Sequence, residues 1–517
     1  MFPKKKPQRS PVGRATRCGL LSEKAMEYLC VGIILVTASV LILSNLGNIY
    51  LWGDEAATAL VSKTILTHGL PMGYDGSNYF SQVFGKECTK NYIWIWHPWF
   101  PFYLLAGFFA VFGVSTLTAR LPFALMGIGT ILLTYYCGKS LWHTRRAGLI
   151  AALLLILSVP FLLLVRQCRY YSPSAFFSLA GLCAYSEMLN GRKRAPLLFG
   201  ASALLLFHTH YMYCATLLAA AIIHSLIFRR DRLKSVLVVS VIVTALCVPW
   251  LFLFAGMGQV VSEYHDKANR AISMLKGFVV QLGTYVFPPW LLALPAFAAW
   301  YRFRRKKRPS ADSEVMRNVV LMLLFCVVTL AAVSATGQRD YFRYLAPLIP
   351  VLILLAALIL DSSMRVHPAI GIVVFALLVC RGQMPDYLYE ITHDYNGPSK
   401  GIAKFLNEHG HPDDLVAVSH EPLPLMFYTN MRIINGTSGE DYSSALNAKW
   451  IVTREKMVKA DGPFADYLNA NIAWEKYEVI TLDCPDIAFE NREDPAAHQY
   501  RTVEIAAPVT ILRRVRP

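Results

Sequence analysis

The sequence predicts a mainly α-helical, polytopic membrane protein with about eleven transmembrane helices, interfacial helices on the outer face and a small C-terminal α/β domain. Hydrophobic residues make up 55% of the chain and charged residues only 16%, whereas soluble proteins carry about 25% charged residues. The apolar runs lie within residues 1–385, and residues 386–517 have the composition of a soluble domain. Lys and Arg collect in short loops between the apolar runs, which is typical of membrane proteins.

A basic tail, residues 1–26, precedes the first apolar run at 27–46. A run of about 20 residues can cross a hydrocarbon core of about 30 Å, and it exceeds the ~7–15 apolar residues of a cleaved signal peptide. We therefore predict an uncleaved first helix with its tail in the cytoplasm. Ten further spans are predicted from hydropathy, at 119–138, 147–165, 172–189, 196–208, 211–228, 235–254, 278–300, 317–335, 345–360 and 368–383.

Short basic loops orient these spans, because such loops stay on the cytoplasmic side. They are Arg145-Arg146, Arg192 to Arg194, Arg229 to Lys234, and Arg302 to Arg308. All four lie on the cytoplasmic side together with the basic tail only if residues 98–114 do not cross the membrane. We therefore predict an aromatic-rich helix lying on the outer interface there.

The first outer loop then covers residues 47–118, and loop 256–277 and domain 386–517 also lie outside, in the periplasm of a bacterial inner membrane. The net charge of +16 and the pI near 9.3 follow from the basic cytoplasmic loops, so we exclude nucleic acid as a partner.

The C-terminal segment alternates helix and strand patterns. Residues 401–410 predict an amphipathic helix ended by Gly410, followed by a turn at 411–414. Short strands are predicted at LVAVSH, MRIING and AKWIVT. Cys88 and Cys484 both lie outside the membrane in this map, so a disulfide between them is an open alternative; no C-x-x-C metal pair occurs.

Two adjacent acids, Asp54 and Glu55, follow the first span. An acid at the membrane edge is a functional candidate, and we assign catalytic roles to both, Asp54 as the base and Glu55 as a group that orients a sugar hydroxyl or a metal. The structural alternative is an N-cap and a first-turn acid of the helix that follows.

Five further groups of polar residues lie at outer span ends. His97 follows two tryptophans that an aromatic belt alone would explain. The arginines suit a phosphate, because guanidinium offers paired donors, although each could also anchor the chain at the interface. His208 and His210 flank a break between spans, and two histidines alone do not make a metal site. The candidate ligand-binding residues are His97, Arg120, Arg166, Arg169, Tyr170, His208, His210, Arg343 and Tyr344.

The order of these motifs resembles the C-type glycosyltransferases of the protein O-mannosyltransferase and lipid A aminoarabinose transferase group. The resemblance covers residues 25 to about 385 and is carried by a series of short motifs, namely Gly53-Asp54-Glu55-Ala56, Gly69-Leu70-Pro71, His97-Pro98, Ala119-Arg120-Leu121-Pro122, Arg166-x-x-Arg169-Tyr170, His210-Tyr211 and Arg343-Tyr344-x-x-Pro347-x-x-Pro350.

This resemblance implies a polyprenyl-phosphate sugar as donor and transfer with inversion on the outer face. It implies that Asp54 is the base and that arginines near Arg120 and Arg343 hold the lipid phosphate. Some members carry Glu-Lys-Pro where this chain has Trp96-His97-Pro98, which argues against the aminoarabinose substrate. A divalent metal held by Glu55, His97 and His210 is an alternative use of these side chains.

The sequence thus predicts a glycosyltransferase that moves a single sugar from a membrane lipid to a hydroxyl of a lipid, polysaccharide or protein acceptor. A transporter or flippase is the first alternative, but it would place polar groups near the bilayer midplane. A ligase that uses lipid-diphosphate glycans is the second.

Overall fold

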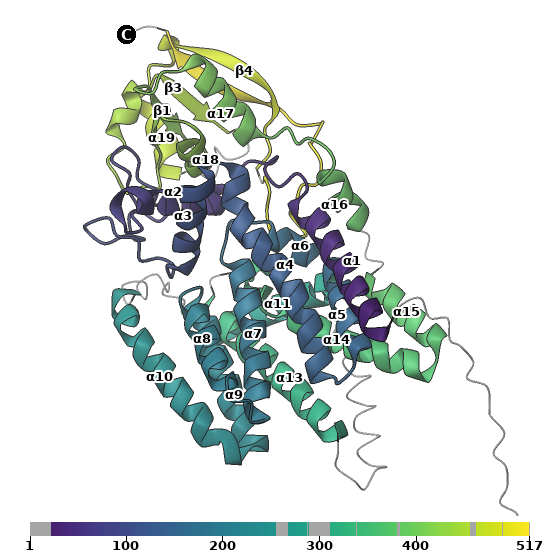
Figure 1. The fold of residues 1–517 in the computed structure, drawn as a ribbon. Helices are drawn as coiled ribbons and strands as arrows, with labels where there is room; N and C mark the ends of the chain where they lie inside the picture. Colours follow the sequence, from purple (N-terminus) through teal and green to yellow (C-terminus); the bar gives the residue numbers. More distant parts are fainter. Residues whose placement is uncertain are drawn as a thin grey trace, which may run out of the picture.

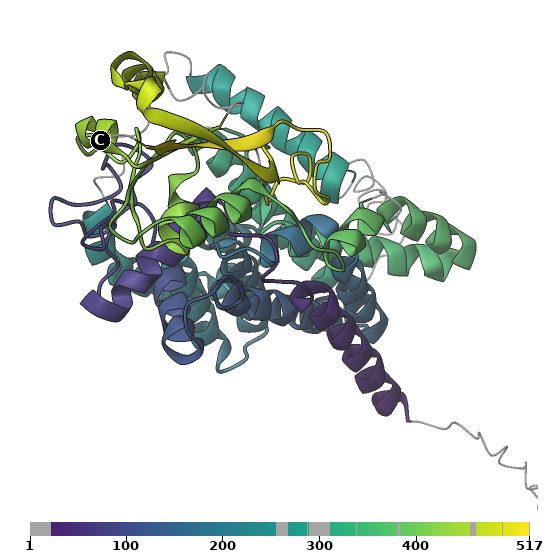
Figure 2. The same ribbon diagram turned by 90° about the horizontal axis from the view of Figure 1, so that it is seen from above.

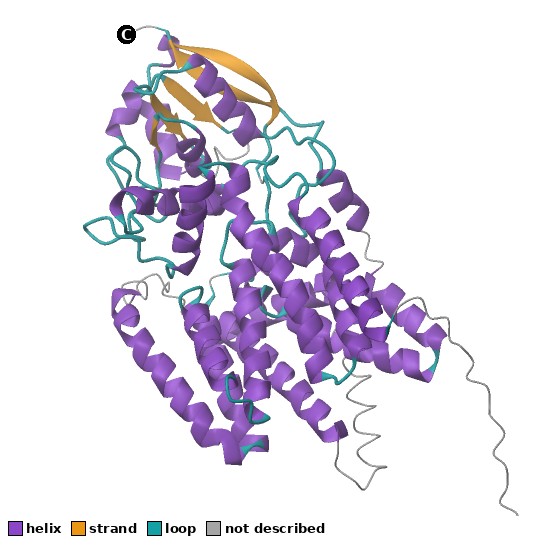
Figure 3. Cartoon of the chain, in the orientation of Figure 1, coloured by secondary structure: helices purple, strands orange, loops and turns teal. Residues whose placement is uncertain are grey.

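A small sheet domain lies at one end of the molecule, and a tilted bundle of helices fills the rest (Figures 1 and 3). The computed structural model describes residues 22–254, 267–286, 288, 311–337, 339–379, 383–454, 462–488 and 490–515. The predicted basic tail up to residue 21 and the loop Arg302 to Arg308 lie outside these ranges. The predicted fold class, a mainly helical membrane protein with a C-terminal sheet, is confirmed.

Six described helices are long and apolar enough to cross a membrane, and eight spans result if each of two bent helix pairs counts as one. The six helices are α1 (Glu23–Leu43), α4 (Thr116–Leu141), α9 (Tyr211–Phe228), α10 (Arg230–Phe254), α13 (Ala311–Thr336) and α14 (Ile349–Val366). The shorter or bent helices of the bundle are α5 (Arg145–Ile156), α6 (Val159–Val165), α7 (Tyr171–Leu189), α8 (Ala195–Phe207), α15 (Pro368–Val379) and α16 (Met384–Glu390).

The predicted span at 147–165 is broken. Helices α5 and α6 meet at an angle of 70°. Pro160 stands in the first turn of α6, and a proline there suits a helix start but would clash within a continuous helix. The bend matters for the site, because α6 leads directly into Arg166, Arg169 and Tyr170.

The predicted outer loop 256–277 is wrong from Lys267 onward, because helix α11 (Lys267–Gln281) begins there and continues into a π-helical turn, η2 (Leu282–Val286). Met274 and Phe278 are buried one helical turn apart, so this helix packs one face on the bundle. Most of the predicted span 278–300 lies outside the described residues.

Helix α3 (Phe100–Phe112) is the predicted interfacial helix. Its 13 residues reach about 20 Å at 1.5 Å per residue, too short for a hydrocarbon core of about 30 Å. Phe102, Leu105 and Phe109 are buried, and the helix packs on α4 and on α2 (Gly53–His68). Figure 1 shows both short helices between the bundle and the sheet domain.

The C-terminal domain contains a mixed five-stranded sheet in the order β2-β1-β3-β5-β4. Seen from above, the sheet lies over the helical bundle (Figure 2). Strand β1 pairs in parallel with β2 and β3, and β5 is antiparallel to β3 and β4. The elements of this domain are α17 (Pro398–His409), β1 (Leu415–Val418), α18 (Pro422–Tyr428), β2 (Arg432–Ile434), β3 (Trp450–Thr453), α19 (Gly462–Asn471), β4 (Tyr477–Pro485) and β5 (Pro508–Arg514), with short 3-10 turns η5 (Ser443–Asn447) and η6 (Trp474–Lys476). A further 3-10 turn, η4 (Phe342–Leu345), lies in the helical bundle between α13 and α14.

The predicted helix ending at Gly410 and the three predicted strands match α17, β1, β2 and β3. The structure adds β4 and β5, and the chain between them descends to the helical bundle (yellow in Figure 1).

The described cysteines form one disulfide, and it is not the pair that the sequence left open. Cys88 and Cys484 are free, and a disulfide joins Cys137 to Cys183 between α4 and α7.

Candidate active site

Asp54 stands in the first turn of α2, between two arginines. Its Oδ2 lies 2.7 Å from Arg343 Nη1 and 3.5 Å from Arg169 Nη2. Arg343 comes from η4, almost 300 residues further along the chain. The two predicted site residues are therefore in direct contact.

The arginines are held in place by other contacts. Arg169 Nη1 donates to the backbone oxygen of Asp54 and to Thr58 Oγ1, both at 3.0 Å. The Arg343 guanidinium lies 4.2 Å from the ring centre of Tyr341 and 5.9 Å from that of Tyr344. Such stacking orients a guanidinium and leaves its edge donors available.

The electrostatics keep Asp54 ionised. Burial raises the pKa of the Asp54 carboxyl, but the adjacent Arg169 and Arg343 lower it more, so that this pKa lies below its ordinary value. At neutral pH the carboxylate is charged and can accept a proton.

Aromatic rings and two histidines form the other side of the site. His97 Nε2 lies 3.5 Å from Arg169 Nη2, and Arg169 lies over the ring of Tyr170 at 5.4 Å. The His210 ring is 5.0 Å from Tyr170 and stacks on Tyr213 at 4.3 Å. Burial and the nearby Arg169 lower the pKa of His97 well below its usual range and that of His210 to about 4, so both rings are neutral at neutral pH.

Four buried polar atoms around Asp54 have no hydrogen-bond partner among the residues that the structure describes. They are His97 Nδ1, Arg169 Nε, Tyr171 Oη and His210 Nδ1. Buried polar groups are normally paired, and an unpaired one needs an explanation. Several such atoms beside one carboxylate indicate a place for a polar ligand.

Glu55 and Arg120 form a separate, closed cluster, which corrects the predicted phosphate contact of Arg120. Glu55 is 0% exposed and accepts from Arg120, from the Cys168 backbone and from Asn491 at 2.7–2.9 Å. Arg120 also donates to three backbone oxygens in residues 46–50. All its donors are engaged, so it holds the chain after α1.

Arg166 and His208 also lie apart from Asp54. Arg166 donates to four backbone oxygens at the end of α1, in residues 41–45. The His208 ring packs edge-on against Trp250 at 5.0 Å, and its backbone oxygen accepts from Phe100. Arg166 therefore caps a helix, and His208 packs beneath α3.

The three side chains proposed for a metal are not brought together. The Glu55 carboxylate faces Arg120 and Asn491, whereas His97 and His210 face Arg169 and Tyr170. Among the described residues, no three His, Cys, Asp or Glu side chains are grouped as metal ligands.

Residues that sequence reasoning missed come from the connection between β4 and β5. Glu493 Oε1 lies 3.4 Å from Arg343 Nη1, and Arg492 lies over the Trp52 ring at 4.4 Å. The sequence around Asn491 has no regular periodicity. No local sequence signal indicates that this loop contacts Arg343 in the helical bundle.

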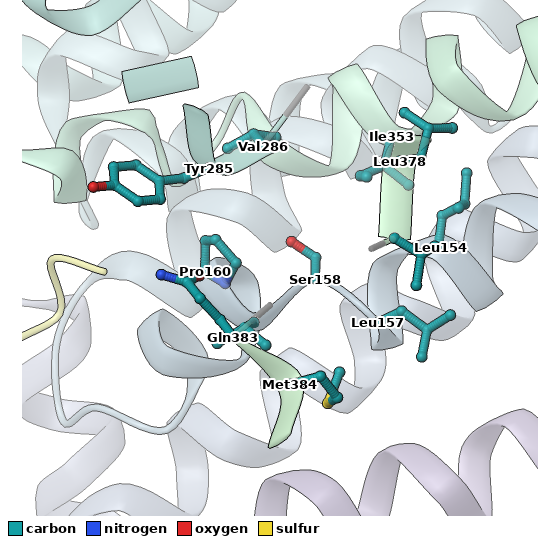
Figure 4. Close-up of a pocket in the computed structure, with 12 residues that line it drawn as sticks. Leu154, Leu157, Ser158, Pro160, Tyr285, Val286, Ile353, Leu378, Gln383 and Met384 are labelled. Atoms are coloured by element: carbon teal, nitrogen blue, oxygen red, sulfur yellow. The ribbon is translucent and has the colours of Figure 1, made fainter. Parts of the chain in front are cut away.

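A small cavity of about 40 Å³ lies at the bend between α5 and α6 (Figure 4). Apolar side chains such as Leu154 and Leu378 line it, with Ser158 and Gln383 as polar groups. It has room for about one or two water molecules, and it includes none of the residues around Asp54.

The sequence matches the family model described as dolichyl-phosphate-mannose-protein mannosyltransferase over residues 96–253. No protein of curated function matches it. Two structures of ArnT from Cupriavidus metallidurans, one bound to undecaprenyl phosphate and one in the apo state, superpose with TM-scores of 0.54 and 0.56, at 15% and 14% identity. Each match covers 95% of this chain and 98% of ArnT.

The apo oligosaccharyltransferase of Archaeoglobus fulgidus also matches, with a TM-score of 0.56 at 14% identity over 89% of this chain and 70% of that one. The chain has the fold of the C-type glycosyltransferases. This C-type fold and the family match together confirm the resemblance predicted from the motifs. The matched range 96–253 includes His97, Arg169 and His210 but neither Asp54 nor Arg343.

Proposed function

We propose that this chain is a membrane glycosyltransferase that moves a single sugar from a polyprenyl-phosphate donor to an acceptor hydroxyl, with inversion, on the outer face of a bacterial inner membrane. The observation that carries the proposal is the Asp54 carboxylate between Arg169 and Arg343, surrounded by unpaired buried polar atoms. A base and a cationic phosphate site in contact are what such a transfer needs.

The reaction is a single displacement. The acceptor oxygen attacks the anomeric carbon and gives its proton to Asp54, while the bond from that carbon to the phosphate oxygen breaks. The electron pair leaves on the phosphate, which Arg169 and Arg343 stabilise as its charge grows. The phosphate is a good leaving group, so the neutral histidines are not required as acids.

Donor binding also prepares the base. In the structure the two arginines lower the pKa of Asp54 after burial has raised it. A bound phosphate shares those cations and adds negative charge, so the pKa of Asp54 increases. Asp54 then becomes a stronger base only when the donor is in place.

ArnT was solved with undecaprenyl phosphate, which supports a polyprenyl phosphate as the donor lipid here. The acceptor is a hydroxyl of a lipid, a polysaccharide or a protein of the cell envelope. The sheet domain lies over the helical bundle (Figure 2) and is our candidate for acceptor binding.

The test uses the purified full-length protein in liposomes with synthetic undecaprenyl-phosphate hexoses and pentoses and an envelope extract as acceptor. Asp54→Asn should lower transfer about 10²- to 10⁴-fold, the usual contribution of a general base. Asp75→Asn is the matched control, because exposed Asp75 only caps its own turn.

Transfer by Asp54→Asn at the wild-type rate would remove Asp54 from the mechanism. Transfer from lipid-diphosphate donors alone would instead make the protein a glycan ligase.

A further inference from the structure

The connection between β4 and β5 joins the C-terminal domain to the active site. We call residues 490–498 the return segment. Asn491 donates to Glu55 at 2.8 Å and accepts from Gln167 at 3.0 Å. His498 lies 2.5 Å from Glu390 of α16. Both ends of the segment are thus fixed to the helical bundle.

Glu493 lies between these two anchors and is 4% exposed. Its Oε1 accepts a hydrogen bond from Arg343 Nη1 at 3.4 Å. The same nitrogen lies 2.7 Å from Asp54 Oδ2. One guanidinium nitrogen is therefore placed between two carboxyl groups that come from different domains.

On balance, the groups around Glu493 make its carboxyl harder to ionise than that of an ordinary glutamate. Burial raises the pKa of Glu493, Asp54 raises it further, and Arg343 and Arg492 lower it less, so that the pKa lies above its ordinary value. The Tyr171 hydroxyl also interacts electrostatically with Glu493. A protonated carboxyl can accept an N–H without neutralising the guanidinium charge.

We propose that Glu493 is a positioning residue: by accepting a hydrogen bond from Arg343, it holds that guanidinium beside Asp54 in the orientation that receives the donor phosphate. The inference rests on the proposed function and extends it, because the C-terminal domain then completes the donor site. An ionised Glu493 would compete with the phosphate for Arg343.

The experiment measures binding of undecaprenyl phosphate alone to the full-length protein in nanodiscs, over a series of pH values that begins near the ordinary pKa of glutamate, about 4.3, and extends upward. Glu493→Ala should weaken binding about 10- to 100-fold, as expected for losing a hydrogen bond to a charged group. Glu493→Gln keeps the neutral acceptor and should bind like wild type at the acidic end.

The pH dependence separates positioning from simple loss of structure. Wild-type binding should weaken relative to Glu493→Gln as the pH rises, because Glu493 then loses its proton. Titration of the phosphate itself affects both proteins equally and cancels in their ratio. The matched control is Asp494→Asn on the same segment, where the Asp494 carboxylate accepts a hydrogen bond from the Ala496 backbone N–H. Thermal melting of each variant identifies any that misfolds.

Two results would overturn the inference. One is binding by Glu493→Ala as tight as wild type, and the other is a ratio of wild type to Glu493→Gln that is constant with pH. Failure of the wild-type protein to bind undecaprenyl phosphate would count against the proposed function instead.

Discussion

The cluster around Asp54 and the cluster around Glu55 begin at neighbouring residues of α2 and use the same side-chain types. They differ in whether their buried polar atoms have hydrogen-bond partners. The Glu55 carboxylate and the Arg120 guanidinium are fully engaged with each other and with backbone groups. The Asp54 side keeps unpaired buried atoms on His97, Arg169, Tyr171 and His210 within the described chain. An acid–arginine pair is a structural element when its other partners are protein atoms, and a site when they are missing.

The largest expected effect tests the closed cluster. Arg120→Ala leaves Glu55 buried without its counter-ion, so we expect a loss of about 3–5 kcal/mol in stability. Thermal melting in detergent measures it. The matched control is Arg192→Ala, because Arg192 pairs with Glu187 on the surface, and exposed pairs contribute about 0–1 kcal/mol.

An Arg120→Ala variant that melts like wild type but transfers no sugar would break the comparison. The closed cluster would then belong to the catalytic machinery.

The second-largest expected effect concerns the cluster around Asp54. Arg343→Gln removes a cation that contacts both Asp54 and Glu493, and we expect transfer to decrease about 10- to 100-fold. The melting temperature should fall less than in Arg120→Ala, because Asp54 is 23% exposed and keeps Arg169. Arg501→Gln, at an exposed pair with Asp386, is the control for transfer.

The two clusters also show how much of the candidate site could be predicted from the sequence. Asp54 could be identified because it comes soon after the first span. Helix α17 could be predicted from its amphipathic pattern ended by Gly410, and strands β1 to β3 from their alternating patterns. Arg120 and Arg343 looked alike, since each stands at an outer span end beside a proline or an aromatic residue.

What separates these two arginines is tertiary structure. Backbone oxygens of residues 46–50 reach Arg120, whereas a loop some 150 residues further along the chain reaches Arg343. The pattern around Glu493 contains no signal for that contact. Two further features have signals in the sequence. Pro160 within the predicted span indicates the helix break, and the β-branched residues of β5 indicate the additional strand.

A smaller effect concerns how kcat/KM depends on pH through the cluster around Asp54. After burial has raised the pKa of Asp54, its arginines lower it below the ordinary value, so wild-type kcat/KM should fall only as the pH drops through this lowered pKa. Arg343→Gln removes one cation and should shift this acidic limb to higher pH by about 1 unit or more. The profile of Arg501→Gln should match wild type; an unshifted limb in Arg343→Gln would mean that Asp54 does not govern it.

The smallest effect tests the segment that links the two clusters, since Asn491 touches Glu55 and Glu493 touches Arg343. Burial lowers the pKa of its anchor His498, but the Glu390 carboxylate at 2.5 Å raises it more, so the folded pKa lies above the ordinary one. A raised histidine pKa stabilises the fold below the unfolded pKa of about 6.5, and the gain is lost as the pH rises through the folded pKa.

The free energy of unfolding of the wild type should therefore decrease as the pH rises from about 6.5 through the folded pKa of His498, by about 1.4 kcal/mol for each unit of pKa difference between the folded and unfolded states, and the melting temperature should decrease with it. His498→Gln should remove most of this dependence and lower stability mainly at the acidic end, because only there is the lost ion pair formed. His68→Gln, at an exposed histidine that ends α2, should keep the wild-type slope. An unchanged slope in His498→Gln would show that the return segment is held by Asn491 and its neighbours alone, and that the two clusters are joined without a titrating contact.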